Sequence, residues 1–421
     1  MWVVLILLWG LSLLFPHSTN TRLLLNLNIE ILYELNFWLV LLSIWCTRAM
    51  VISSSTTGRD SSNEKISIFV SLLMCLYLCF SSENLIFFYF FFELSLIPIL
   101  ALILGWGYQP ERLFSGISML FYTLVASLPL LIVILILLVY FKSVSYYVRL
   151  GTIDHSNRVR LYIYLPIVLG FLVKLPIFGP HLWLPRAHVE APVYGSMILA
   201  AVLLKLGVAG LFIFSFILTR KTEVLWFLQR FSCVGGSIAR ILCLLLRDIK
   251  TLIAYSSVAH IGLLTCAIFM INKFGIVGTT LIAVAHGIVS SGLFWGRNVL
   301  YKRSATRSLL IVKRSLNFTP LFSFIWFVLC LGNIGAPPTL NLISEIYIII
   351  GRLANNLVLI IPVLTAAFMA TAFTLNLYIA TQHNQSSSSL SPYLNLHPVE
   401  ILLGVNHIIL VLWVPLIFFF S

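Results

Sequence analysis

A series of apolar segments, each about as long as a bilayer is thick, limits the possible folds of this chain more than any other feature. An α-helix needs about 20 apolar residues to cross the hydrocarbon core. Such segments lie near residues 35–55, 66–82, 84–106, 114–141, 160–180, 193–218, 223–246, 250–271, 275–296, 318–336, 356–381 and 399–420, with a shorter run near 339–352. Together with a first run from Met1 to Phe15, they predict an all-α polytopic membrane protein with about 13–14 transmembrane helices.

The composition excludes a soluble fold. Apolar residues make up 60% of the 421 residues and charged residues 9%, whereas soluble domains have about half and about a quarter. The 26 Lys and Arg outnumber the 13 Asp and Glu. Because most of these basic residues lie in short connecting loops, we expect them to contact phospholipid headgroups and predict no nucleic-acid binding.

The cysteines do not suggest a metal or iron–sulfur site. The seven cysteines lie mostly inside apolar runs and form no CxxC motif. Cys75 and Cys79 are one helical turn apart, but they lack His or carboxylate neighbours, so packing is the favoured interpretation. We therefore predict that the cysteines bind neither zinc nor an iron–sulfur cluster.

Short loops leave no room for an extramembrane domain. The run from Met1 to Phe15 lacks a basic region and a small-residue cleavage site, so we interpret it as a retained helix and not as a signal peptide. Basic residues among apolar ones in the segment 297–316 predict an amphipathic helix on the membrane surface. The Ser386–Ser389 run predicts a flexible linker. The distribution of Lys and Arg gives no orientation.

Four ionisable residues, Glu93, Lys174, Lys205 and Glu345, lie well inside apolar segments. A charge at the bilayer centre costs about 2.5–3.5 kcal/mol, so such residues persist only when they are paired, hydrated or neutralised. They could form a structural ion pair between helices or an ion or proton pathway. Two residues of each sign on four separate spans favour the pathway.

An ion pair that forms and separates could drive proton transfer. A desolvated lysine can lose its proton near neutral pH, and a neighbouring carboxylate favours its charged form. A contact pair of Glu93 and Lys174 is worth about 4 kcal/mol at an effective dielectric constant of 20. Moving one charge through 100 mV costs about 2.3 kcal/mol, so the two energies match in scale.

Two histidines and two arginines extend this set of polar residues. A neutral imidazole both donates and accepts a hydrogen bond, so His286 and His260 could pass protons. The alternative for each is a simple hydrogen bond between helices. Arg230 and Arg240 lie in a weakly apolar span and either reach the interface or face a protein neighbour.

Helix-breaking residues coincide with two of the intramembrane charges. Pro176, Gly179 and Pro180 follow Lys174, and the segment 335–338 with its Gly and Pro residues precedes Glu345. Two interrupted apolar segments, far apart in the sequence and each with an ionisable residue, are typical of an inverted-repeat transporter. Ordinary proline kinks are the alternative.

Five stretches of the chain resemble one family. These are FFFELSLIPILALILGWGYQPERL, KLPIFGPHLWLPRAHVEAPVYGSMILAAVLLKLG, RDIKTLIAYSSVAHIGLL, AHGIVSSGLF and GAPPTLNLISE. They resemble the antiporter-like, proton-translocating membrane-arm subunits of respiratory complex I, the mitochondrial NADH–ubiquinone oxidoreductase. The resemblance runs from about residue 84 to residue 381, with the motifs in the family's order.

The resemblance implies two inverted five-helix repeats, each with a broken helix, around a polar axis at the membrane midplane. It divides the chain into N-terminal helices (1–83), a first repeat (84–246), a second repeat (247–381), and a linker with a C-terminal helix (382–421).

The resemblance also implies roles for the site residues. The proton-translocating set is the acidic partner Glu93, the broken-helix lysine Lys174, the central lysine Lys205, the linking histidine His286 and the second acidic residue Glu345. His181, Arg186, His188 and Glu190 would shape the helix break or its aqueous mouth. Arg297 stands where relatives have a small or apolar residue and could anchor to a headgroup or a partner.

The function implied is a non-redox subunit of a translocase in the mitochondrial inner membrane. NADH, FMN, iron–sulfur clusters and ubiquinone would be bound by other subunits, and neighbouring antiporter-like subunits and phospholipids would be the partners. Two alternatives are a stand-alone or Mrp-type cation/proton antiporter and a purely structural membrane-arm subunit. Copurification with flavin and iron–sulfur subunits tests the first alternative. Neutralising mutations that harm stability but spare turnover would favour the second.

Overall fold

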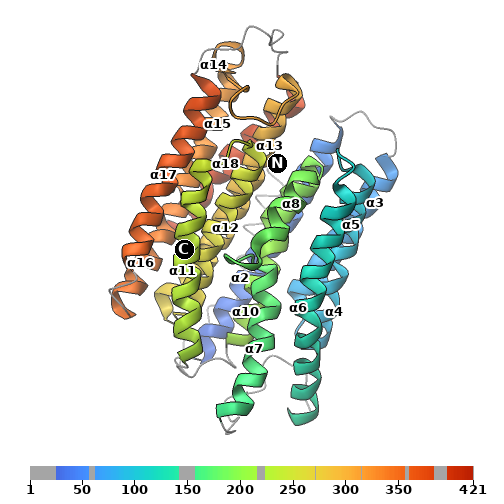
Figure 1. Ribbon diagram of the computed structural model, residues 1–421, viewed down its shortest axis with the longest axis vertical. Helices are drawn as coiled ribbons and strands as arrows, with labels where there is room; N and C mark the ends of the chain where they lie inside the picture. The colour runs from blue at the N-terminus through green and yellow to red at the C-terminus, as the bar shows by residue number, and fades with distance from the viewer. Residues whose placement is uncertain are drawn as a thin grey trace.

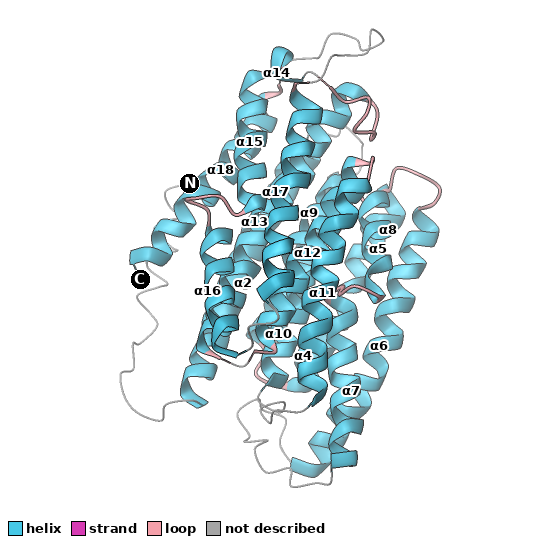
Figure 2. Cartoon of the chain, turned by 60° about the vertical axis from the view of Figure 1, so that its left-hand side comes forward, coloured by secondary structure: helices cyan, strands magenta, loops and turns pink. Residues whose placement is uncertain are grey.

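The chain folds into an elongated bundle of helices (Figures 1 and 2). The computed structural model describes residues 25–55, 62–141, 157–215, 223–270, 272–313, 315–355, 360–383 and 396–420. Within these ranges no β-strand occurs, and an isolated bridge pairs Asp248 with Ser308. The all-α fold is therefore confirmed for the described part of the chain.

The helices follow the predicted apolar segments closely. They are α2 (Leu25–Ser55), α3 (Ser62–Ser81), α4 (Leu85–Leu94), α5 (Leu96–Trp106), α6 (Arg112–Phe141), α7 (Asn157–Lys174), η2 (Pro180–Leu182), α8 (Trp183–Glu190), α9 (Val193–Ile198), η3 (Leu199–Leu203), α10 (Leu204–Ser215), α11 (Glu223–Leu245), α12 (Ile249–Ile268), α13 (Lys273–Ser304), α14 (Ser315–Phe318), α15 (Pro320–Ile334), α16 (Leu340–Asn355), α17 (Ile360–Gln382) and α18 (Pro398–Phe420).

Ten helices of the described part are long and apolar enough to cross a membrane, and two shorter apolar ones span Ile163–Lys174 and Pro320–Ile334. This confirms a polytopic membrane protein. The run from Met1 to Phe15 and the Ser386–Ser389 linker lie outside the described residues, so the total number of spans stays a prediction.

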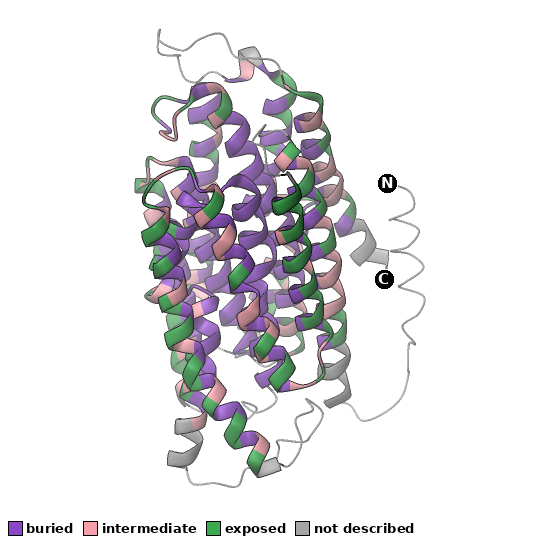
Figure 3. Cartoon of the chain, turned by 90° about the vertical axis from the view of Figure 1, so that its right-hand side faces the viewer, coloured by how far each residue is buried: buried purple, intermediate pink, exposed green. Residues whose placement is uncertain are grey.

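Burial divides the bundle into inner and outer helices. The span Val193–Phe214 is wholly buried, and α12 and α13 are nearly so; Figure 3 shows this buried interior between outer helices with exposed faces. The outer helix α6 exposes large apolar side chains, such as Phe121 and Val139, which suit contact with lipid or another subunit. Polar residues on the inner helices are therefore held away from lipid.

Small residues let the inner helices approach closely. A side chain at Gly262 on α12 would place its Cβ 2.8 Å from the Cα of Gly236 on α11. Such contacts between glycines bring two backbones together, which is the common way to pack helices within a membrane. The polar side chains described below come from helices held at this short range.

The amphipathic surface helix predicted for the segment 297–316 is wrong. Instead, α13 continues to Ser304, and residues 305–313 form a non-helical strap. The strap is fixed to the start of α12, because the Ile249 amide donates to the Arg307 carbonyl (3.1 Å) and the Leu309 amide donates to the Arg247 carbonyl (2.8 Å).

Internal partners account for the basic residues of that segment. Lys302 and Arg303 at the end of α13 form ion pairs of 3.1 and 2.8 Å with Glu400 on α18. Arg297 is buried over the ring of Tyr301, with its guanidinium carbon 4.7 Å from the ring centroid. Lys302 and Arg303 therefore join α13 to α18. Arg297 instead contacts a residue of its own helix, and its burial disfavours the first of its two alternatives, the headgroup contact.

We predict that Gly335→Ala destabilises the protein by roughly 1–2 kcal/mol, because Gly335 has a φ of 79° and L-residues are strained there. The thermal unfolding midpoint of the detergent-purified protein measures this. Gly105→Ala is the control, because a Cβ at Gly105 on α5 would meet nothing within 4 Å. Equal midpoints for the two variants would contradict the assignment of backbone strain to Gly335.

Candidate functional site

Lys174 is the last residue of α7, at the first predicted helix break. The chain then turns through Gly179, which has a φ of 117°, before η2 and α8 continue. The Lys174 side chain is 4% exposed. Its Nζ donates a 2.6 Å hydrogen bond to the carbonyl of Phe92 on α4 and lies 3.1 Å from the centroid of the Phe92 ring.

Glu93 follows Phe92, but its carboxylate does not bind Lys174 directly. Both Glu93 carboxylate oxygens are buried and have no hydrogen-bond partner. The two side chains are nevertheless within electrostatic range of each other. The structure thus places Lys174 near Glu93, with the lysine bound to the carbonyl of the preceding residue, Phe92. A direct Glu93–Lys174 ion pair stays a prediction.

Lys205 lies in the most buried part of the bundle, one residue into α10. The preceding turn, η3, is π-helical, a form that occurs mostly as single turns, often at functional sites. Lys205 Nζ donates to the Ala200 carbonyl within this turn (2.5 Å) and lies 3.0 Å from His286 Nδ1 on α13. The predicted neighbours Lys205 and His286 are therefore in direct contact.

His260 continues the series from His286 toward Glu345. The rings of His286 and His260 are 5.4 Å apart between centroids. His260 Nδ1 lies 4.0 Å from Glu345 Oε1, and Nε2 lies 3.2 Å from Asn333 Oδ1. His260 is 1% exposed, so it belongs to the buried axis and is more than a peripheral contact between helices.

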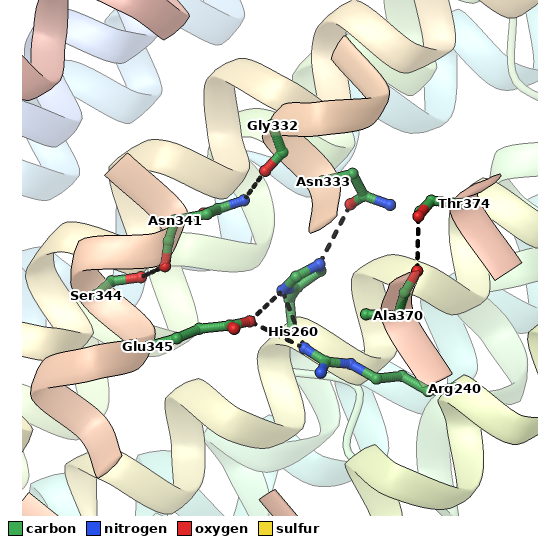
Figure 4. A network of polar contacts seen from close by, with 9 residues as sticks. All are labelled: Arg240, His260, Gly332, Asn333, Asn341, Ser344, Glu345, Ala370 and Thr374. Carbon is green, nitrogen blue, oxygen red and sulfur yellow. Dashed lines mark hydrogen bonds and ion pairs between the residues drawn. The ribbon is translucent and has the colours of Figure 1, made fainter. Parts of the chain in front are cut away.

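Arg240 joins the same cluster from α11, and Figure 4 shows it converging with His260 and Glu345. Arg240 Nη2 donates to Glu345 Oε1 (3.2 Å) and faces His260 Nδ1 at 3.5 Å. Because a guanidinium only donates hydrogen bonds, Nδ1 of His260 is the acceptor and Nε2 carries the hydrogen that Asn333 accepts. Arg240 is fully buried. Of the two alternatives that the sequence leaves open, Arg240 therefore faces a protein neighbour and does not reach the membrane interface.

The second helix break positions Glu345. Helix α15 ends at Ile334, Gly335 and a cis Pro337–Pro338 bond follow, and α16 starts at Leu340. Asn341 Nδ2 donates to the Gly332 carbonyl across the break (2.6 Å). This bond satisfies a buried backbone acceptor and fixes the start of α16, and thus the position of Glu345 one turn later.

The polar residues of the motif HLWLPRAHVEAP, which follows the first break, have different surroundings. His181 stacks on Phe178 and accepts a hydrogen bond from the Gly179 amide at Nδ1 (3.0 Å), so it shapes the break as predicted. Arg186 lies over the ring of Phe114. His188 is wholly buried, so the prediction that it lines an aqueous mouth does not describe its surroundings.

Sequence reasoning missed or underrated three residues. Asn333 and Lys250 were not singled out, and Arg240 was left open. Asn333 does carry a signal, since it is an amide within the GNIGAPP break, where polar groups must satisfy unpaired backbone. Lys250 follows a polar Arg–Asp pair and resembles an ordinary interfacial lysine in sequence; the structure buries it.

The described residues contain no group of three or more His, Cys, Asp or Glu that could hold a metal ion. All seven cysteines are buried. The arrangement is instead a series of groups that can each gain or lose a proton, namely Lys205, His286, His260 and Glu345. Groups of this kind are suited to proton transfer within a membrane.

We predict that Asn341→Ala costs about 1–3 kcal/mol of stability, because it leaves the buried Gly332 carbonyl without its hydrogen bond. The unfolding midpoint of the purified protein measures the loss. Thr365→Ala on α17 is the control, since the exposed Thr365 hydroxyl bonds only to a carbonyl of its own helix. A loss no larger than that of the control would contradict the role given to Asn341.

Comparisons with known proteins place this geometry in context. A family model described as NADH:quinone oxidoreductase/Mrp antiporter, TM, matches residues 82–374. NADH-ubiquinone oxidoreductase chain 4 of Ceratitis capitata is 43% identical over 83% of this chain and 78% of its own length. That of Aedes aegypti is 46% identical over 78% of this chain and 72% of its own length.

A solved structure has the same fold. A chain of respiratory complex I from Thermus thermophilus with bound NADH superimposes with a TM-score of 0.78. The match covers 91% of this chain and 81% of that chain at 21% identity.

Proposed function

Because the chain belongs to the NADH:quinone oxidoreductase/Mrp antiporter family, and within it to the NADH-ubiquinone oxidoreductase chain 4 branch, we propose that it translocates protons in the membrane arm of respiratory complex I. The family predicted from the motifs is thereby confirmed. The chain 4 relatives at 43% and 46% identity favour this function over a stand-alone Mrp-type antiporter. The protein is a multi-pass component of the mitochondrial inner membrane.

One observation carries the proposal: a buried series of ionisable groups runs from the π-helical turn before Lys205 to the second helix break. Lys205 contacts His286, the ring of His286 lies beside His260, and His260 lies beside Glu345. The lysine ammonium donates to His286 Nδ1, and an imidazole that accepts a proton at one nitrogen releases one from the other. Because the two ring centroids are 5.4 Å apart, proton transfer between the rings requires a bridging water.

Arg240 holds Glu345 in its carboxylate form. Its hydrogen bond stabilises the carboxylate, which is the proton-accepting form. The same guanidinium faces the acceptor nitrogen of His260. A proton moving from His260 to Glu345 therefore requires Arg240 to give up one of these contacts, which makes the transfer sensitive to small movements of α11.

Glu93 and Lys174 act as the electrostatic switch of this axis. In the described geometry Lys174 is bound to the Phe92 carbonyl, while the Glu93 carboxylate is unbonded. Moving Nζ from that carbonyl to the next residue's carboxylate forms a contact worth about 4 kcal/mol. Forming or breaking the Glu93–Lys174 contact changes the electrostatic potential at Lys205, and therefore the proton affinity of the Lys205 amine.

The chain's part in the enzyme is proton translocation, without electron transfer of its own. NADH, FMN, iron–sulfur clusters and ubiquinone belong to other subunits, and coupling reaches this chain through its neighbours in the arm. The exposed apolar faces of the outer helices meet those neighbours and phospholipids.

We predict that Lys174→Met or Lys205→Met reduces NADH-driven proton pumping at least about tenfold while leaving assembly of the complex largely intact. Proton uptake into sealed vesicles, measured together with NADH oxidation, tests this. Lys273→Met is the control, because Lys273 is an exposed cation at the start of α13, outside the axis.

Two outcomes would contradict the proposal. An assembled Lys205→Met complex that pumps at the native rate would remove Lys205 from the pathway. Variants that lose assembly while the remaining complex pumps normally would instead identify a structural subunit.

A further inference from the structure

Lys250 occupies the gap between α8 and α9, although it belongs to α12. Its side chain is 1% exposed. Nζ donates to the carbonyls of Val189 (2.9 Å) and Ala191 (2.7 Å), which flank Glu190 at the end of α8. An ammonium group has three hydrogens and a neutral amine has two. Both protonation states can therefore keep these two bonds, and the third hydrogen is the one that can leave.

His188 lies two residues before Glu190 and is completely buried. Its ring stacks on Phe294 of α13, with centroids 4.5 Å apart and planes 12° apart. Neither ring nitrogen has a hydrogen-bond partner. Leaving a buried polar group unbonded costs about 1–3 kcal/mol, so an imidazole used only for packing would be less favourable here than a phenyl ring.

His188 has neighbours on both sides: it precedes Val189, whose carbonyl binds Lys250, and its ring stacks on α13, the helix that carries His286. His188 also lies within electrostatic range of Lys250 toward the end of α8 and of Lys205 toward the axis. His286 is likewise within range of His188. Since α8 packs directly on α12, the imidazole stands between Lys250 and the start of the buried series.

Glu190 connects this group to the membrane face. Its Oε1 lies 3.9 Å from Arg307 Nη1 in the strap 305–313, and the Arg307 side chain is 26% exposed. The other carboxylate oxygen, Oε2, is buried without a partner. The strap joins the end of α13 and the start of α12, which are ends of two candidate spans at the same face.

We infer that Glu190, Lys250 and His188 form a side branch through which protons reach Lys205 from the membrane face covered by the strap 305–313. This inference rests on the proposed function and adds an access route to it. It changes the interpretation of the motif HLWLPRAHVEAP, since two of its residues would carry protons as well as shape the break.

The transfers balance without any further reactant. Glu190 takes a proton from water at the face and passes it to the neutral amine of Lys250, and the carboxylate is restored. The Lys250 ammonium gives its third hydrogen to one ring nitrogen of His188, directly or through water. The opposite nitrogen releases a proton to the neutral amine of Lys205, and the stacking on Phe294 keeps the ring plane fixed meanwhile.

The test uses the whole complex reconstituted in sealed liposomes, with NADH oxidation and internal acidification measured together. His188→Phe preserves the stacking on Phe294 but cannot relay a proton, and Lys250→Met removes the amine. We expect each to lower proton pumping at least about tenfold. We also expect a larger solvent deuterium effect on the residual rate, which a merely structural defect would not produce.

His407→Phe is the matched control. His407 on α18 is also completely buried and stacks on Trp295, but it lies outside the proposed branch. The His407→Phe complex should pump at the native rate. Lys205→Met in the same series tests the proposed function itself.

The possible results distinguish a failure of the side branch from a failure of the proposed function. If Lys205→Met stops pumping while His188→Phe and Lys250→Met pump normally, the side branch is wrong and the axis stands. If Lys205→Met pumps normally, the proposed function fails. Should His188→Phe not assemble, His188→Gln replaces it with the same expected loss; if neither assembles, His188 is structural and the inference is wrong.

Discussion

The structure depends on the hydrogen bonds that replace water around its buried lysine side chains. Each of the three lysines described above donates to backbone carbonyls where regular α-helix is interrupted. Lys174 binds Phe92 next to the junction of α4 and α5, Lys205 binds Ala200 in a π-helical turn, and Lys250 binds both sides of the gap between α8 and α9. Irregular backbone within a membrane is tolerated only where its polar groups are satisfied, so at these three places the lysine and the interrupted backbone stabilise each other.

Compensation by carbonyls has a functional consequence. A carboxylate partner favours the ammonium form strongly, whereas a carbonyl accepts a hydrogen bond from an amine and from an ammonium alike. Such a lysine can lose its proton without leaving an uncompensated negative charge behind. The one tightly paired carboxylate of the axis, Glu345, instead binds the permanently charged Arg240. The lysines are thus suited to exchange protons, and the arginine fixes the end of the series.

The family resemblance placed Lys205 and His286 on one pathway but did not predict their direct contact. Sequence alone predicted the helical segments and both breaks. These predictions depend on local patterns, since hydrophobic length gives spans and Gly–Pro clusters give breaks. It did not predict that Lys174 would bind a carbonyl from a residue 82 positions away, because backbone acceptors leave no mark in a sequence. The burial of Arg240 and Lys250 and the loss of the surface helix at 297–316 depend on tertiary neighbours, namely Glu345, the α8–α9 gap and Glu400.

The proposed function requires a continuous hydrated path that joins Lys205, His286, His260 and Glu345. An electron cryomicroscopy map of the assembled complex that resolves ordered water tests it most directly. We expect ordered waters within hydrogen-bond distance of one another and of these side chains along the whole axis, with one water between the rings of His286 and His260. A dry, apolar gap between Lys205 and Glu345 in every conformation of the active complex would contradict it.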